Sequence, residues 1–252
     1  MSTTEGPSGA GKPRRALLLA AGLGTRLKPL TDTTPKCLVP VQGRPLLDYW
    51  LENLTAGGVE RILINTHALA PAVEAHLAAS PWRSRVDLVY EPELFGTGGT
   101  IAANRTWLGR DPFLMAHADN LTDFDVQALF AAHAGRPDAC QITMLAFRTD
   151  DPRSCGILEQ DERGVVTAFH EKVDHPPGDL ANAAVYVLEP SVADFAAAAA
   201  RPFLDFSTEV VPHFLGRILG VAHAGYHRDI GNLESLRRAN AEFPGHRPKP
   251  AG

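Results

Sequence analysis

The residues best suited to chemistry near the start of the chain are glycines followed by an arginine and a lysine. The stretch GLGTR (22–26) directly follows the apolar run ALLLAA (16–21), and Lys36 lies ten residues after Arg26. Glycines let backbone N–H groups approach a phosphate, a guanidinium binds it through two parallel hydrogen bonds, and an ammonium adds a point charge. The spacing predicts a phosphate-binding turn at the carboxyl end of a strand, where open α/β sheets bind ligands.

A second glycine-rich stretch, GPSGAGKP (6–13), has the G-x4-G-K pattern of a phosphate loop but not its context. That loop joins a strand to a helix, so that free N–H groups at the helix start face the phosphates. Here no predicted strand precedes the motif, and Pro13 supplies neither a hydroxyl for Mg²⁺ nor a backbone N–H. We interpret residues 1–14 as a disordered leader, which disfavours a phosphate-loop kinase. A Rossmann dehydrogenase is disfavoured because Leu27 occupies the third glycine position of its fingerprint.

The elements that must position this turn are short apolar runs alternating with helical segments. Strands are predicted at 16–21, 61–67, 86–91, 112–119 and 141–147, and helices at 45–58, 71–80, 99–108 and 125–135. Alternation of this kind predicts a largely parallel sheet covered by helices on both faces.

The second half of the chain has a more mixed pattern. A hairpin is predicted over 155–172, a strand at 181–190, a helix at 191–200, a segment beginning at a predicted N-cap at 205–216, strands within 218–230 and a helix at 232–243. No linker-like break separates the halves. We therefore expect a single domain over 15–243, followed by a disordered tail over 244–252.

Composition limits the classes of partner. The chain has 252 residues, a net charge of −5 and 44% hydrophobic residues, so we expect no broad nucleic-acid or membrane footprint. No apolar run is long enough to predict a membrane span or an export signal. Three cysteines without a CxxC pair indicate a reducing compartment, and we expect a cytoplasmic protein.

The segment LAAGLGTRLKPLTDTTPKCLVPVQGRPLLDY (19–49) resembles the sugar-1-phosphate nucleotidyltransferases. Their signature, L-x-x-G-x-G-T-R followed ten residues later by a catalytic lysine, has the same spacing here. The similarity continues in order through FGTGGT (95–100), AHADN (116–120), FHEK (169–172), ANAAVYVL (181–188) and RDIG (228–231). The resemblance implies a Rossmann-like three-layer α/β/α fold with a mostly parallel mixed central sheet. It also implies attack of a sugar 1-phosphate on the α-phosphorus of a nucleoside triphosphate, with release of pyrophosphate.

The resemblance also assigns roles to individual residues. Arg26 and Lys36 are implied as catalytic cations, with Arg26 on the triphosphate and Lys36 on the α-phosphoryl group. Asp119 and Asp229 are implied as Mg²⁺ ligands, although Asp119 could instead be a strand-end turn residue and Asp229 a helix N-cap. The implied nucleotide-binding residues are Ala20, Ala21, Gly22, Gly24, Thr25, Arg26, Glu91, Gly96 and Thr97. The implied sugar-phosphate-binding residues are Asn120, Gly156, Glu171, Lys172 and Asn182.

The sequence departs from many relatives at two places. Ala118 precedes Asp119 where glycine is common, and we expect His117 before it to be a packed core histidine rather than a site-tuning one. Ala21 replaces the second glycine of the GG form. Glu91 aligns with the base-reading position. A carboxylate only accepts hydrogen bonds, which suits the adjacent N1–H and N2 donors of guanine, so we expect GTP as the donor.

For the acceptor, the resemblance favours mannose 1-phosphate or a manno-heptose 1-phosphate. Uridylyl or thymidylyl transfer to another sugar 1-phosphate, such as an N-acetylated amino sugar, is an alternative. A non-catalytic nucleotide-sugar sensor is a further alternative, disfavoured because all four charged residues of the implied centre are present. The sequence is also compatible with a homodimer.

Overall fold

The computed structural model describes residues 14–245, and the central element of these is the strand β1 (Arg15–Leu19). It pairs in parallel with β4 (Arg61–Thr66) and β6 (Phe113–His117), and β4 pairs in parallel with β5 (Val86–Tyr90). Because all four strands run the same way, the residues after each strand meet at one edge of the sheet. The predicted strands in this half are confirmed.

The nine-stranded sheet becomes mixed beyond β6. The long strand β11 (Leu180–Leu188) runs antiparallel to β6 and to β8 (Ile142–Arg148), and β8 pairs in parallel with β12 (Ile218–His223). The predicted hairpin forms from β9 (Gly156–Gln160) and β10 (Val166–Glu171) at the far edge. The mixed α/β sheet inferred from the sequence is thus confirmed.

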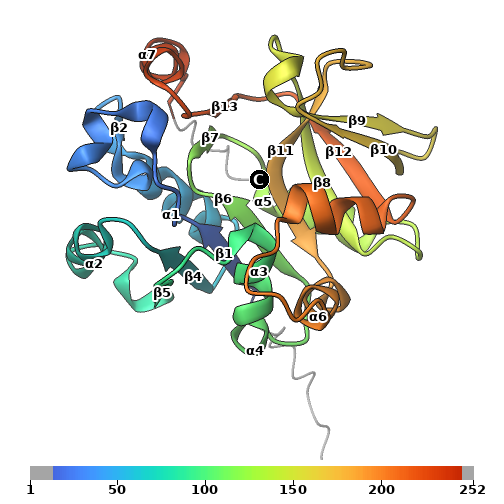
Figure 1. Cartoon of the computed structure of the whole chain (residues 1–252), viewed down its shortest axis with the longest axis horizontal. Coiled ribbons are helices and arrows are strands. Elements are labelled where there is room, and N and C mark those ends of the chain that lie inside the picture. Colours follow the sequence, from blue (N-terminus) through green and yellow to red (C-terminus); the bar gives the residue numbers. More distant parts are fainter. Residues whose placement is uncertain (1–13, 246–252) are drawn as a thin grey trace, which may run out of the picture.

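Helices cover both faces of this sheet, which gives three layers (Figure 1). Alternate residues of β1 enter two hydrophobic clusters: Ala16 and Leu18 pack on one side, Leu17 and Leu19 on the other. The first cluster includes residues of α1 (Leu46–Ala56), α2 (Ala70–Ala78) and α5 (Val126–Ala134). The second includes residues of α3 (Gly96–Ala103), α4 (Arg105–Leu108) and α6 (Pro190–Ala198). None of the helices within residues 14–245 has the length and apolar character needed to cross a membrane.

A small antiparallel ribbon and the helix that follows it complete the described chain beside the main sheet. The strand β7 (Asn120–Thr122) pairs with β13 (His227–Asp229), and α7 (Leu233–Glu242) follows. A third cluster, including Leu121, Ile230 and Phe243, joins the ribbon and α7 to α1. A two-residue pair, β2 (Pro40–Val41) and β3 (Arg44–Pro45), lies next to α7, and the backbone N–H of Gln42 between them donates to Asn240 Oδ1.

One sequence-based boundary needs correction. The helix predicted at 99–108 begins at Gly96 and is divided into α3 and α4 at Asn104. The predicted N-cap is confirmed, because Asp205 accepts the N–H of Thr208, and the segment after it forms a π-helical turn (Phe206–Val210) and a 3-10 turn (Val211–Phe214). At the start of the described residues, the carbonyl of Arg14 accepts the N–H of Glu60 at the sheet edge. The GPSGAGK stretch lies outside the described residues.

Candidate active site

A cavity of about 260 Å³ opens at the carboxyl ends of the parallel strands. We call it the strand-end cavity. Its lining includes eight of the predicted site residues: Ala20, Ala21, Gly22, Lys36, Glu91, Gly96, Thr97 and Asp119. These residues come from separate segments that follow β1, β5 and β6. They lie close together because the parallel strands end at the same edge of the sheet.

A second cavity, of about 440 Å³, lies beside the first between the 147–155 segment and α7. We call it the arginine cavity, because four arginines line it together with Lys172 and Asp229. These arginines are Arg26, Arg148, Arg228 and Arg238. The predicted site residues are therefore divided between two adjoining cavities.

Lys36 connects the two cavities. It begins a 3-10 turn (Lys36–Leu38) after Pro35, and its side chain is only 10% exposed. Its Nζ donates to Asp119 Oδ2 at 2.5 Å and lies 3.6 Å from Asp229 Oδ1. The Lys36 ammonium is therefore held between the two carboxylates that the resemblance implies as metal ligands.

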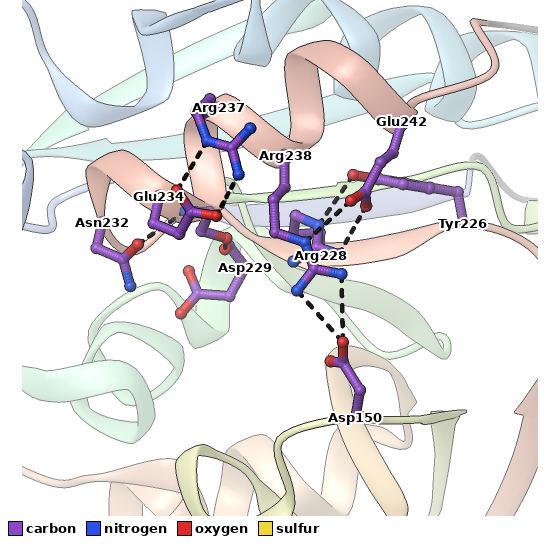
Figure 2. A network of polar contacts seen from close by, with 10 residues as sticks. Asp150, Tyr226, Arg228, Asp229, Asn232, Glu234, Arg237, Arg238 and Glu242 are labelled. Carbon is purple, nitrogen blue, oxygen red and sulfur yellow. Dashed lines mark hydrogen bonds and ion pairs between the residues drawn. The ribbon is translucent and has the colours of Figure 1, made fainter.

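The two aspartates meet because the ribbon pairs their neighbours. Asn120 in β7 lies opposite Asp229 in β13, and the N–H of Ile230 donates to the carbonyl of Asp119 at 3.0 Å. The alternative role of Asp229 as a helix N-cap is wrong, because the side chain of Asn232 accepts the N–H of Ser235 at the start of α7. The Asp229 carboxylate points away from Arg228 and Arg238 (Figure 2).

The electrostatic environments of the two carboxylates differ. Burial opposes ionisation of Asp119, but the charge of Lys36, followed by His117 and by hydrogen bonds, outweighs it and lowers the pKa of Asp119. Burial and then the neighbouring Asp119 charge raise the pKa of Asp229, and Lys36 and Arg26 offset this only in part. His117 is half-buried and lines the strand-end cavity, so it has the site-tuning position rather than the packed one.

These residues fit a divalent cation that also binds substrate phosphates. Among residues 14–245, no group of three or more histidine, cysteine or acidic side chains is placed to hold a metal. Magnesium commonly takes one or two carboxylates and completes its shell with water and phosphate oxygens. Asp119 and Asp229 are the two carboxylates that could hold such an ion.

The glycine turn has a tight, fixed conformation. Gly24 has φ +64°, and a Cβ there would lie 2.9 Å from Thr31 Cγ2. The hydroxyl of Thr31 donates to the Gly24 carbonyl at 2.7 Å, and a 3-10 turn (Thr25–Leu27) follows. Gly24 and Thr25 do not appear in the lining of either cavity described above, whereas Arg26 lines the arginine cavity. The turn therefore directs Arg26 toward Asp229 rather than into the strand-end cavity.

Glu91 lies in the strand-end cavity, but its carboxylate is engaged within the protein. Its Oε1 accepts from Asn65 Nδ2 at 2.9 Å and from Thr100 Oγ1 at 2.6 Å, and its Oε2 accepts the N–H of Phe95 at 3.3 Å. The side chain is 1% exposed. The expected two-bond recognition of guanine needs correction, since such pairing would displace one of these internal bonds.

The predicted sugar-phosphate residues do not share one environment. Asn120 is buried and donates to the Ala183 carbonyl at 3.2 Å, so its side-chain amide N–H is used within the protein, and its contact with substrate stays a prediction. Asn182 donates to the Tyr186 hydroxyl at 2.6 Å. A Cβ at Gly156 would lie within 2.6 Å of the ends of the Phe169 and Glu171 side chains, so a larger residue there would have to displace them.

Lys172 reaches the arginine cavity from the end of the hairpin. Its Nζ lies 3.4 Å from Glu171 Oε1, and its side chain is 63% exposed. An exposed ion pair of this length adds little stability. The ammonium is therefore available to an anion in the cavity.

Sequence reasoning missed several residues of the site. Asn65 follows the pattern of a polar residue at a strand end and could have been found; its Oδ1 accepts the N–H of Ala20 at 2.7 Å. Arg228 begins the RDIG motif, but no role was expected for its side chain, and Arg238 had no local signal. Arg238 contacts Asp150 at 3.2 Å, 88 residues earlier in the sequence, and both arginines contact Glu242 (Figure 2).

Comparison with known proteins shows which sequences and structures the chain is similar to. Mannose-1-phosphate guanylyltransferase of Mycobacterium tuberculosis is 34% identical over 242 residues, covering 94% of this chain and 66% of that protein. Glucose-1-phosphate thymidylyltransferase of Streptomyces griseus is 32% identical over 234 residues, covering 90% and 65%. The chain thus spans slightly under two thirds of the length of these relatives.

Among solved structures, HddC from Yersinia pseudotuberculosis complexed with GMP-PN has a TM-score of 0.77 and 26% identity, covering 91% of this chain and 99% of that one. Residues 15–244 match the family described as nucleotidyl transferase, which includes nearly all of the described chain and every residue of the site. The chain belongs to the nucleotidyl transferase family.

Proposed function

We propose that the chain transfers a nucleoside monophosphate from a nucleoside triphosphate to a sugar 1-phosphate. A phosphate oxygen of the sugar 1-phosphate attacks the α-phosphorus, and the bond from that phosphorus to the β-phosphate oxygen breaks, releasing pyrophosphate. The observation that carries the proposal is the position of Lys36 between Asp119 and Asp229, where the two cavities adjoin.

The residues of the two cavities divide the work of this reaction. The strand-end cavity offers backbone groups at Ala20, Ala21 and Gly22 to the nucleotide. The arginine cavity offers Arg26 and Lys172 to the phosphates of the two substrates. Two like unit charges at ~4 Å repel by about 4 kcal/mol at an effective dielectric of ~20, so the cations must offset the approach of one anion to another. Positioning and charge stabilisation then account for the catalysis.

Magnesium is the proposed cofactor, held by Asp119 and Asp229. When bound, the ion would neutralise phosphate charge and orient the phosphates. Lys36 keeps Asp119 ionised and placed for this task.

We propose GTP as the donor and a mannose-type sugar 1-phosphate as the acceptor. The support is the similarity to the Mycobacterium tuberculosis guanylyltransferase and to HddC with GMP-PN, rather than the side chain of Glu91. Thymidylyl transfer to glucose 1-phosphate is the second candidate, supported by the Streptomyces griseus relative. A single catalytic domain over 15–243 is part of the same proposal.

The test is pyrophosphate release from GTP, dTTP, UTP and ATP, each with mannose 1-phosphate, glucose 1-phosphate and N-acetylglucosamine 1-phosphate. We expect the highest kcat/KM for GTP with mannose 1-phosphate, and loss of activity with a chelator that added Mg²⁺ restores. Higher kcat/KM for dTTP with glucose 1-phosphate would select the second candidate. Release of no pyrophosphate from any pair would contradict the proposed function.

A further inference from the structure

The segment Phe203–Asp205 faces the strand-end cavity from outside the predicted motifs. Phe203 and Asp205 both line the cavity, together with Lys36 and Asp119. The side chain of Phe203 is 54% exposed, although large apolar side chains are usually buried. An exposed aromatic ring at the edge of a substrate cavity is typical of a binding surface.

The start of α3 holds this segment in place. The carbonyl of Leu204 accepts the N–H of Gly98 at 2.8 Å and the N–H of Gly99 at 3.0 Å, and the N–H of Leu204 donates to the carbonyl of Phe95 at 2.9 Å. The Phe203 ring lies against Gly96, where a Cβ would approach its Cε2 to 3.0 Å. Because these bonds fix the backbone, Phe203 and Asp205 are positioned before any ligand binds.

The carboxylate of Asp205 has one fixed oxygen and one with spare capacity. Its Oδ1 accepts the N–H and the hydroxyl of Thr208, at 2.8 and 2.9 Å, as an N-cap. Its Oδ2 accepts one long contact, 3.5 Å from Thr97 Oγ1. In the strand-end cavity, Asp205 therefore differs from Glu91, whose two oxygens share three internal bonds.

The surroundings of Asp205 point to a sugar rather than a base. The ring of Phe206, the residue after Asp205, packs against the ring of Tyr186 with centroids 4.9 Å apart, and the Tyr186 hydroxyl accepts a hydrogen bond from Asn182 at 2.6 Å. These contacts place the segment that carries Asp205 beside Asn182, a residue expected to face the sugar. A carboxylate accepts hydrogen bonds from hydroxyls and repels phosphate, which agrees with a neutral polyhydroxylated ring at this place.

We propose that Phe203 and Asp205 form the subsite for the sugar ring of the acceptor, with hydroxyls bound by Asp205 Oδ2 and a C–H face of the ring packed on Phe203. The inference rests on the proposed function and adds residues that determine acceptor specificity.

The test measures KM for the sugar 1-phosphate and for the nucleoside triphosphate separately in Asp205→Asn and Phe203→Ala. The Asp205→Asn change keeps an oxygen that can accept the N–H of Thr208 at the N-cap. It replaces Oδ2, which is proposed to accept from the sugar hydroxyls, with an amide group that donates. We expect KM for the sugar 1-phosphate to rise about 10-fold or more in Asp205→Asn, and about 3- to 10-fold in Phe203→Ala, with KM for the nucleotide changed less than about 2-fold.

The matched controls are Asp125→Asn, which removes a charge at the N-cap of α5, and Leu233→Ala, which removes an exposed apolar side chain on α7. Both should leave the two KM values unchanged. Unchanged sugar KM in an active Asp205→Asn or Phe203→Ala enzyme would overturn the subsite, as would a rise confined to the nucleotide KM. An inactive wild-type enzyme would instead overturn the proposed function, so the two failures are distinguishable.

Discussion

The two cavities that adjoin at Lys36 are built by different means. The strand-end cavity is formed by backbone at strand ends and by side chains such as Asn65 and Glu91, whose polar atoms bond to one another. The arginine cavity is formed by long charged side chains from separate segments, and the Asp150 and Arg238 side chains of its outer ion pair are 71% and 36% exposed.

The difference matters because exposed ion pairs contribute little to stability, typically under about 1 kcal/mol, whereas buried polar networks are costly to disturb. The strand-end cavity is therefore fixed by the fold itself. The arginine cavity can change its contacts at small cost when a charged ligand enters. The boundary between the two cavities is formed by Lys36, Asp119 and Asp229. Substitutions of these residues therefore test whether the strand-end cavity is more rigid than the arginine cavity.

The largest effect is expected from Lys36→Ala. It removes the cation shared by the two cavities, and loss of one preorganised donor typically costs about 10²–10³ in rate, so we expect kcat to fall by roughly that factor. Steady-state pyrophosphate release measures it. The matched control is Lys28→Ala, an exposed lysine paired with Asp32 at 3.0 Å, which should stay within about 2-fold of wild type. Equal losses in both variants would contradict the central role of Lys36.

The second prediction separates the two carboxylates by stability. Asp119→Asn and Asp229→Asn should each lower activity at limiting Mg²⁺ by about 10- to 100-fold, because each removes a proposed metal ligand. Their stabilities should change in opposite directions at neutral pH. The pKa of Asp119 is lowered, so its ionised form stabilises the fold above the unfolded pKa, and Asp119→Asn should destabilise it. The pKa of Asp229 is raised, so its charge opposes folding at neutral pH, and Asp229→Asn should stabilise the fold.

Urea unfolding of the metal-free variants at neutral pH measures these changes. Repeating it at decreasing pH should show the advantage of Asp229→Asn over wild type disappearing as Asp229 of the wild type takes up its proton. A shift of the same sign for both variants would mean that the two cavities do not differ in the way described.

The smallest effect is expected from Asp150→Asn at the outer edge of the arginine cavity. The ion pair with Arg238 is exposed, and Arg238 keeps its contact with Glu242 at 2.9 Å. We expect a change in kcat/KM within about 2-fold and little change in the free energy of unfolding. A large loss of stability would show that this wall is as rigid as the strand-end cavity.

The parts of the site that local sequence encodes were predictable. The apolar run of β1 followed by GLGTR fixes a strand and a turn within a few residues, and the alternation of strands and helices fixes the parallel sheet. Lys36 could be predicted because it lies ten residues after Arg26, and Asp119 because it ends the predicted strand at 112–119. Their direct contact is a long-range consequence of the fold, which the ribbon pairing β7 with β13 extends to Asp229.

The parts that depend on distant partners were not predictable. Glu91 looked free to read a base because nothing near it in the sequence announces Asn65 and Thr100, which lie on β4 and α3. Asn120 was assigned to the sugar phosphate by the resemblance alone, and nothing near it in the sequence indicates that its side chain donates to the Ala183 carbonyl. Residue type and spacing indicate which hydrogen bonds a side chain can form. Contacts with residues distant in the sequence determine which of its polar atoms stay available to a ligand.

The long separation in sequence between Asp229 and its partners has a consequence for synthesis. Lys36, Asp119 and the parallel strands leave the ribosome well before this second carboxylate, which then joins them through the ribbon and is held in place by α7. A growing chain can therefore form the parallel strands before the segment that carries Asp229 has been made. If the proposed function holds, the pair of carboxylates proposed to hold a metal is complete only after the ribbon has closed.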